Sequence, residues 1–208
     1  MWSFNGYTGR DSVGGLIDSL SGRVVIVCGG ADGVFDEYAR AMREFERPVV
    51  FAVNDVGVRL LRVDHWFSYH GDKLMEWSKR REAVEMDKRW KLHSSGPLAA
   101  GIDYDWTGTE PTTFSLSGQF AMQIAFLMGA ERIILCGCPM DETPRFFETK
   151  CHEADGNDNF KYGAGDTPSD RNVREVMERE FRRLPDFKAK IRSMSGWSAS
   201  YFGGLTDG

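Results

Sequence analysis

The sequence predicts an α/β protein: a Rossmann-like, mainly parallel sheet with helices on both faces, built as a single domain. Two observations predict this fold class. Short apolar runs followed by Gly or Asn alternate with stretches whose apolar residues recur at helical spacing, and such alternation is typical of parallel sheets. The 208 residues suffice for one substantial core, and the sequence contains no internal repeat or low-complexity tract.

The first elements follow from apolar patterns and the glycines around them. Residues 1–20 are expected to contain a leading helix, around Val13–Leu20, that packs on the edge of the sheet. Arg23–Cys28 is an apolar run between glycines, which predicts a central strand. Apolar residues at helical spacing then predict a helix over Phe35–Glu46, and Val49–Val53 is a second buried strand.

The next elements are shorter. A short helix is predicted over Val56–Leu61, and His65–Ser68 is a third strand. Lys73–Arg81 has apolar residues on one helical face, which predicts a helix. Trp90–His93 is a further strand candidate.

The last elements begin with a segment that is apolar nearly all round. Ser117–Gly129 predicts a helix sandwiched between other elements, followed by a buried strand ending at Gly137. A late amphipathic helix runs through Val173 and Leu184. Lys190–Ser193 is the last strand candidate, and Ser195–Trp197 is expected to turn into a short tail.

Two long polar segments interrupt this pattern. Residues 94–117 are rich in Gly, Pro, Thr and Asp, and residues 139–169 are similarly irregular. Long irregular segments in a compact domain are often functional, so both are candidate active-site loops.

Composition and charge exclude several classes of protein. The net charge of −5 weighs against a broad nucleic-acid surface, which usually has a basic excess, but it leaves room for a local phosphate site. No run approaches the ~18 apolar residues of a membrane helix. The N-terminal residues lack the build of a signal peptide, so we expect a cytoplasmic protein with no membrane partner.

The cysteines are expected to be free thiols, because nothing in the sequence indicates a secreted protein. No Cys-x-x-Cys spacing occurs, which disfavours a structural zinc site, and we predict no metal ligands. The four cysteines are Cys28, Cys136, Cys138 and Cys151.

Ligands of open parallel sheets bind at the carboxyl ends of the strands, so the residues there are the first site candidates. Gly29 and Gly30 follow the first strand and would let backbone approach a phosphate; the alternative is a tight turn without a ligand. The spacing matches neither G-x-G-x-x-G nor a P-loop, which disfavours an NAD or P-loop site. Asn54 follows the second strand and can hold a phosphate oxygen, a ribose hydroxyl or a base edge, or it can cap the next helix.

Further candidates follow the later strands. His70 could act as an acid or base, or it could be a helix-start residue with a partly exposed ring. Ser117 and Gly118 open a helix whose hydroxyl and free N–H groups could bind a phosphate, unless Ser117 only caps the helix. Asp141 could pair with a sugar hydroxyl or a metal, or be solvated. His152, in the second loop, could supply a base on closure, or be solvated.

Taken in order, several motifs resemble one family. They are Val25–Gly30, Val53–Asp55, Val63–Ser68, Met128–Asp141 and, more weakly, Ile191–Gly196. Together they resemble the MptE-like superfamily. That group includes archaeal 6-hydroxymethylpterin diphosphokinases, the Maf flagellin glycosyltransferases and, more distantly, the bacterial sialyltransferases of glycosyltransferase family 42.

The resemblance implies that the first turn, the Asn and the Ser-Gly turn hold a nucleotide. In this chain these residues are Gly29, Gly30, Asn54, Ser117 and Gly118. In the sialyltransferases a loop His acts as the base, and His152 lies in the corresponding region. The first turn departs from the family pattern, because Asp32 would repel a phosphate unless it caps the following helix or binds a metal.

Three functions fit these observations. The first is a transferase that uses a nucleotide-activated donor, and the best candidate is a small sialyltransferase-like glycosyltransferase. In this enzyme His152 or His70 deprotonates the hydroxyl of a glycan or small-molecule acceptor. The second is a diphosphokinase-like enzyme that moves pyrophosphate from ATP to a small alcohol, with Mg²⁺ on carboxylates such as Asp32, Asp55 or Asp141. The third is a non-catalytic nucleotide or sugar-phosphate binding protein.

The sequence also indicates which partners and which source to expect. The nucleotide or nucleotide-sugar is the expected ligand, no tightly held cofactor is predicted, and nucleic acid is not an expected partner. Aromatic residues near the tail, Trp197, Tyr201 and Phe202, could serve a homo-oligomer interface. A protein of this build could come from a bacteriophage or a bacterium.

Overall fold

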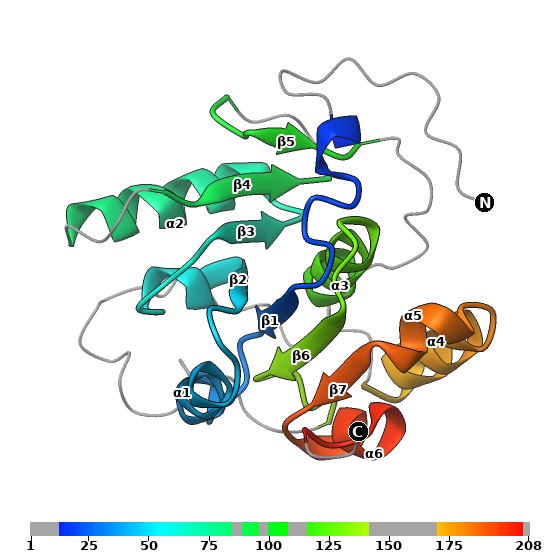
Figure 1. The fold of residues 1–208 in the computed structure, drawn as a ribbon. Coiled ribbons are helices and arrows are strands. Elements are labelled where there is room, and N and C mark those ends of the chain that lie inside the picture. Colours follow the sequence, from blue (N-terminus) through cyan, green and yellow to red (C-terminus); the bar gives the residue numbers. More distant parts are fainter. Residues whose placement is uncertain (1–12, 85–88, 96–99, 108–115, 142–169, 206–208) are drawn as a thin grey trace.

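A computed structural model describes residues 13–84, 89–95, 100–107, 116–141 and 170–205 (Figure 1). Within them lies one seven-stranded sheet, in the order β5-β4-β3-β2-β1-β6-β7, and all neighbouring strands run parallel. The strands are β1 Val24–Cys28, β2 Val49–Val53, β3 His65–Ser68, β4 Lys91–Ser94, β5 Tyr104–Asp105, β6 Arg132–Cys136 and β7 Ile191–Ser193.

Helices cover both faces of this sheet (Figure 1). They are η1 Val13–Leu16, α1 Val34–Glu44, η2 Asn54–Val58, α2 Gly71–Ala83, α3 Ser117–Leu127, α4 Asp170–Arg182, α5 Pro185–Ala189 and α6 Gly196–Phe202, where η marks a 3-10 helix. Elements α1, α2 and η2 share a core with Ile26 and Trp66 on one face. Elements η1 and α3 to α6 share a core with Val27 and Phe67 on the other. The predicted α/β fold, with a parallel sheet and helices on both faces, is confirmed.

The central strands are apolar throughout because both of their faces are covered. Residues 25–28 of β1 are fully buried, and β2 is buried along its whole length. Helix α3 is buried nearly all round, as its composition predicts, because it lies between the sheet and elements such as α5. The rings of Phe126 and Phe187 meet there at 4.7 Å.

The leading helix is the first element that differs from its prediction. Within Val13–Leu20 only Val13–Leu16 is helical, as a 3-10 turn. A longer helix is interrupted at Asp18, whose backbone is left-handed, with φ 58°. The backbone N–H groups of Asp18 and Leu20 then donate to the end of α3, at 3.2 and 2.6 Å. Asp18 and Leu20 therefore attach to the end of α3, while Val13 and Leu16 join the core on this face of the sheet. The predicted packing of the leading helix on the sheet edge stays a prediction.

The C-terminal part also differs. The expected turn and tail after β7 is the helix α6, and the short helix α5 precedes β7. Strand β5 lies inside the segment predicted as a loop, residues 94–117, although it has only two residues. The predicted helix over Val56–Leu61 is the 3-10 helix η2, which begins two residues earlier, at Asn54.

Strand β7 forms one edge of the sheet, and its outer side is occupied. The N–H of Ser193 donates to the carbonyl of Gly203 at 3.0 Å. The Arg192 guanidinium donates to the carbonyls of Ile191 and Ala189 at 2.8 and 3.0 Å. These contacts satisfy backbone N–H and C=O groups that an exposed edge strand would otherwise offer for pairing with another chain.

Among the described residues, no helix has both the length and the apolar character needed to span a membrane.

Candidate functional site

The carboxyl ends of β1 to β4 lie along one edge of the sheet, because these strands are parallel. The strand order reverses at β1, which has β2 on one side and β6 on the other. Open parallel sheets bind ligands at the carboxyl ends beside such a reversal. We call this side of the sheet the carboxyl edge.

Asn54 follows β2 at this edge, and hydrogen bonds fix both its backbone and its side chain. Its backbone is left-handed, with φ 56°, and its carbonyl accepts a hydrogen bond from the indole of Trp66 at 2.5 Å. Its side-chain Oδ1 accepts one from the hydroxyl of Ser68, the last residue of β3, at 2.9 Å. The Ser68 oxygen in turn accepts the backbone N–H of His70 at 3.0 Å.

Ser117 opens α3 at the same edge. The backbone N–H of Tyr69 donates to the Ser117 hydroxyl oxygen at 3.3 Å. The helix is preceded by Leu116 as its N-cap, with no side-chain cap bond, so Ser117 is not the capping residue of the alternative interpretation. A Cβ at Gly118 would meet no described residue within 4 Å, so among these residues there is open space beside the first turn of α3.

These contacts bring three predicted site residues together. Asn54, His70 and Ser117 come from three different elements, and Ser68 and Tyr69 connect them. We call these five residues the carboxyl-edge cluster. Sequence reasoning missed Ser68 and Tyr69 as site residues; their position at the end of a predicted strand, the criterion that selected Asn54, was the available signal.

Gly29 and Gly30 follow β1 at the same edge, and Gly29 has a structural reason to be glycine. A Cβ there would lie 2.5 Å from both the carbonyl oxygen of Gly137 and the sulfur of Cys138. The Gly29 N–H also donates to the Cys136 carbonyl at 2.8 Å. Glycine at position 29 therefore lets the segment after β6 pack closely against the turn after β1. The next residue, Gly30, is half-buried.

His70 and His152 are the two predicted bases. His70 occupies the N-cap position of α2, makes no side-chain cap bond, and has an exposed side chain. It therefore lies next to Ser68 with its ring toward solvent. His152 lies outside the described residues, as does most of the predicted loop 139–169.

Asp141 follows β6 and lies against the start of α6. Its Oδ2 would contact a Cβ added at Gly196. The surrounding loop is held by Ser198, whose hydroxyl donates to the Cys138 carbonyl at 2.6 Å, and by Arg174, which donates to the Met140 carbonyl at 2.6 Å. Because β1 lies between β2 and β6, Asp141 is on the other side of the strand-order reversal from Asn54.

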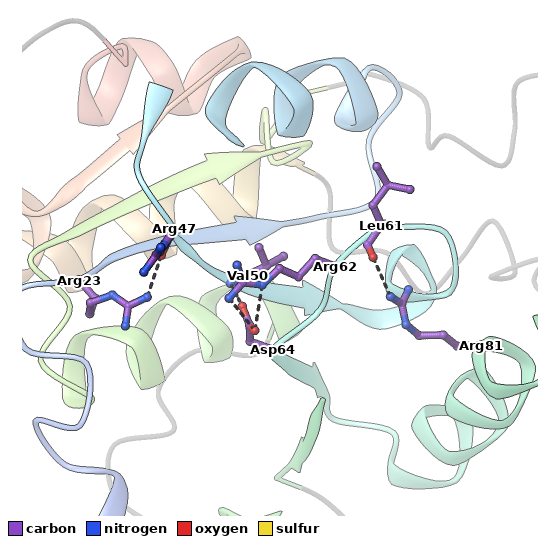
Figure 2. A network of polar contacts seen from close by, with 7 residues as sticks. All are labelled: Arg23, Arg47, Val50, Leu61, Arg62, Asp64 and Arg81. Carbon is purple, nitrogen blue, oxygen red and sulfur yellow. Dashed lines mark hydrogen bonds and ion pairs between the residues drawn. The ribbon is translucent and has the colours of Figure 1, made fainter. Parts of the chain in front are cut away.

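A buried arginine supports the turn that follows Asn54. Arg81 of α2 is 1% exposed, and its guanidinium donates to the carbonyls of Gly57 and Leu60, each at 2.6 Å. Figure 2 shows it reaching the Leu61 carbonyl as well. In the same view Asp64 accepts the N–H of Val50 at 2.8 Å and pairs with Arg62. Helix α2 and strand β2 thereby fix the loop from both sides.

Two histidines form a buried pair that sequence reasoning treated only as strand residues. His65 Nδ1 and His93 Nε2 lie 2.8 Å apart, and the Trp106 indole N–H donates to His93 Nδ1 at 3.1 Å. Because the indole only donates, neutral His93 carries its hydrogen on Nε2 and donates to His65. Burial lowers the pKa of His65 to about 4 and lowers the pKa of His93 well below its usual value.

The predicted free thiols are confirmed at three positions, Cys28, Cys136 and Cys138, which are all buried. Burial raises the pKa of the Cys138 thiol to about 12. The contact with Cys28, followed by burial, raises the pKa of Cys136. The thiols of Cys136 and Cys138 therefore stay protonated near neutral pH, which makes them poor nucleophiles. Cys151 lies outside the described residues, and within them no three His, Cys, Asp or Glu side chains gather as metal ligands.

A cavity of about 410 Å³ lies away from these residues, between α4, α5, β7 and the end of α6. Its lining is apolar at Phe181, Pro185, Ala189 and Phe202 and cationic at Arg182, Lys188 and Arg192. None of the predicted site residues that the structure describes lines it.

No family model matches this chain, and no curated protein resembles it in sequence. Among solved structures, the monofunctional alpha-2,3-sialyltransferase Cst-I from Campylobacter jejuni has a similar fold, with a TM-score of 0.56. The match covers 88% of this chain and 80% of that one, at 14% sequence identity. The MptE-like part of the resemblance stays a prediction. At this identity the likeness shows that the chain shares its α/β fold with a sialyltransferase.

Proposed function

We propose that this chain is a transferase that uses a nucleotide-activated donor, acting as a small sialyltransferase-like glycosyltransferase. The observation that carries the proposal is the carboxyl-edge cluster. Asn54, His70 and Ser117 meet beside the strand-order reversal of a sheet whose fold resembles that of a sialyltransferase. That position is where open parallel sheets bind nucleotides.

Each residue has a role in the proposal. The nucleotide lies across the carboxyl edge, held by Asn54, by Ser117 and the free N–H groups beside Gly118, and by the turn at Gly29 and Gly30. The first-turn amides of α3 are the groups that stabilise negative charge as the donor's phosphate departs.

The base that deprotonates the acceptor hydroxyl is His70 or His152 in this proposal. His70 is supported by its exposed ring next to Ser68. Asp141, on the β6 side of the edge, is proposed to contact the donor or acceptor sugar. Its contact with Gly196 couples that role to the position of α6.

The test is binding followed by turnover. Purified protein is analysed by mass spectrometry for co-purified nucleotide, then titrated calorimetrically with CMP, UMP and GMP, and assayed for hydrolysis of the corresponding sugar donors. We expect one nucleotide to bind and its sugar donor to be hydrolysed. The absence of binding by all three at millimolar concentration would contradict the proposal.

The same samples separate the other two functions named from the sequence. Release of AMP from ATP that requires Mg²⁺ would support the diphosphokinase-like enzyme. A non-catalytic binding protein would bind nucleotide equally well after His70→Ala and His152→Ala together and would hydrolyse no donor. A loss of turnover in that double variant, with binding intact, supports the transferase.

A further inference from the structure

We infer that Ser68 holds the Asn54 carboxamide in one orientation, so that Asn54 turns its NH₂ group toward a ligand at the carboxyl edge. The ligand atom that meets this NH₂ group is then a hydrogen-bond acceptor, such as a phosphate, hydroxyl or carbonyl oxygen, and Ser68 is a positioning residue. The inference rests on the proposed function for the class of ligand, a nucleotide. The orientation itself rests on the hydrogen bonds of the free protein.

The orientation follows from the hydroxyl of Ser68. This side chain is fully buried, and its oxygen already accepts the N–H of His70 at 3.0 Å. Leaving a buried hydroxyl hydrogen without an acceptor costs free energy, and for Ser68 the acceptor among the described residues is Asn54 Oδ1, 2.9 Å away. If the carboxamide were turned over, its NH₂ group would face Ser68 and the hydroxyl hydrogen would be left without a partner.

The rest of Asn54 is fixed as well. Its left-handed backbone and the hydrogen bond from Trp66 to its carbonyl set the position of the Cα. Trp66 is itself fully buried and packs on Gly57, where any side chain would collide with the indole. The residue is therefore pre-organised before a ligand arrives, which reduces the entropy lost on binding.

The free half of the amide is its NH₂ group. Among the described residues nothing accepts a hydrogen bond from Asn54 Nδ2, and this atom is not one of the buried atoms without a partner. It therefore faces accessible space. An NH₂ group donates to phosphate, hydroxyl and carbonyl oxygens but not to the exocyclic amine of a base, so on a base edge only the acceptor atoms can meet Asn54.

The experiment uses the free protein and then CMP, UMP and GMP. The side-chain Nδ2–H₂ signals of Asn54 are followed by NMR in the wild type, in Ser68→Ala and in Ser94→Ala. Ser94 is the matched control, because it pairs with Ser68 in register, is 3% exposed, and its hydroxyl has no hydrogen-bond partner among the residues that the structure describes. We expect Ser68→Ala to shift and broaden the Asn54 signals and Ser94→Ala to leave them unchanged.

Nucleotide binding gives the second readout. We expect Ser68→Ala to weaken the best-bound nucleotide about tenfold, and Ser94→Ala to leave the affinity within about twofold of the wild type. Asn54→Asp keeps an acceptor for Ser68 but removes both donors, so it should weaken binding by about a hundredfold. Titration with the matching nucleoside separates a phosphate acceptor from the acceptors of the nucleoside. The Asn54 Nδ2–H signal moves with the nucleotide alone if it meets phosphate, and with both if it meets a base or ribose oxygen.

Unchanged Asn54 signals in Ser68→Ala, or wild-type affinity in Asn54→Asp, would overturn the inference while leaving the proposed function intact. If the wild type binds no nucleotide, the proposed function fails, and the signals of the free protein still decide whether Ser68 orients Asn54.

Discussion

Gly29 and Gly118 are both candidate nucleotide-binding residues, but their surroundings differ. A Cβ at Gly29 would meet the Gly137 carbonyl and the Cys138 sulfur at 2.5 Å, whereas one at Gly118 would meet none of the described residues within 4 Å. The first glycine is therefore required by packing, and the second only by whatever occupies the space beside α3. Substitution by Ala separates these two reasons.

Gly29→Ala is expected to destabilise the fold by about 1–3 kcal/mol, because overpacking forces the backbone of two strands apart. Urea unfolding measures the loss. A free energy of unfolding equal to that of the wild type would show that the two strand ends separate easily.

Gly118→Ala is expected to raise the free energy of unfolding by about 0.5–1 kcal/mol, since Ala is the better helix former. The same change should weaken nucleotide binding, because the new methyl group occupies the open space beside Ser117. Calorimetric titration tests this point, and an unchanged affinity would mean that the ligand does not approach α3 closely.

The His65–His93 pair makes the protein sensitive to acid. Burial lowers both pKa values below the usual value of 6.5, in His65 to about 4, so the unfolded chain binds more protons than the folded one between these values. The free energy of unfolding is therefore highest above pH 6.5 and falls as the pH drops toward 4. For His65 alone the loss is about 3 kcal/mol. Urea unfolding at pH 7.5, 6, 5 and 4.5 measures it.

His65→Asn is the matched variant for this prediction. An Asn oxygen can accept the hydrogen bond from His93, but the side chain does not titrate. Asp64, Lys91 and Asp103 act on the pair electrostatically and stay in place. We expect a shallower loss of stability with acid. A slope identical to that of the wild type would assign the acid sensitivity to other groups.

At the scale of elements, α2 and η2 act as one unit because Arg81 joins them. Its guanidinium donates to two carbonyls of the turn after Asn54 and lies 5.0 Å from the ring centre of Trp90. Arg81→Met preserves much of the apolar volume but leaves the buried carbonyls without donors. We expect the free energy of unfolding, measured in urea, to fall by about 2–4 kcal/mol. We also expect weaker nucleotide binding by calorimetry, because the turn that positions Asn54 loses its support. Stability equal to that of the wild type would mean that water satisfies these carbonyls.

The elements that sequence patterns predicted well have strong local signals. Strands β2 and β3 have their predicted bounds, because each is an apolar or aromatic run bounded by polar residues or turns. Strand β5 has two residues and is defined by its pairing with β4, which joins Tyr104 to His93 and Asp105 to Ser94. Directly after the strand, the backbone N–H of Trp106 donates to the Ser94 carbonyl at 2.8 Å. Helix α6 is rich in Ser and begins at a Gly, a composition typical of turns, and Ser198 secures it to the β6 loop through tertiary contacts.

In the candidate site, too, the residues with a local sequence signal were predicted, and those defined by tertiary contacts were missed. Sequence reasoning selected Asn54, His70 and Ser117 one strand end at a time, and parallel pairing brings them to one edge. Ser68 and Tyr69 were missed because their hydrogen bonds depend on strand register and on the approach of α3. The His65–His93 pair was missed for a related reason, since its partners lie 28 residues apart and meet only across two strands.

At the scale of the whole molecule, one sheet carries two cores, and the single-domain organisation stays a prediction. The indoles of Trp66 and Trp106 report on opposite faces, through hydrogen bonds to Asn54 and His93. We expect their NMR signals to disappear at the same urea concentration. Phe202→Ala, which should remove about 3–5 kcal/mol from one core, should lower both midpoints together. A shift confined to Trp106 would indicate two separately unfolding units.

The position of β1 between β2 and β6 has a consequence during synthesis. Cys28 and Arg132 are 104 residues apart (132 − 28), and a ribosome that adds about 5–20 residues per second needs on the order of 5–20 s for that length. Through this interval the nascent chain exposes an apolar strand with one open side, a template for pairing with neighbouring nascent chains. We expect the yield of folded protein to depend on chaperones that shield such strands until β6 leaves the ribosome.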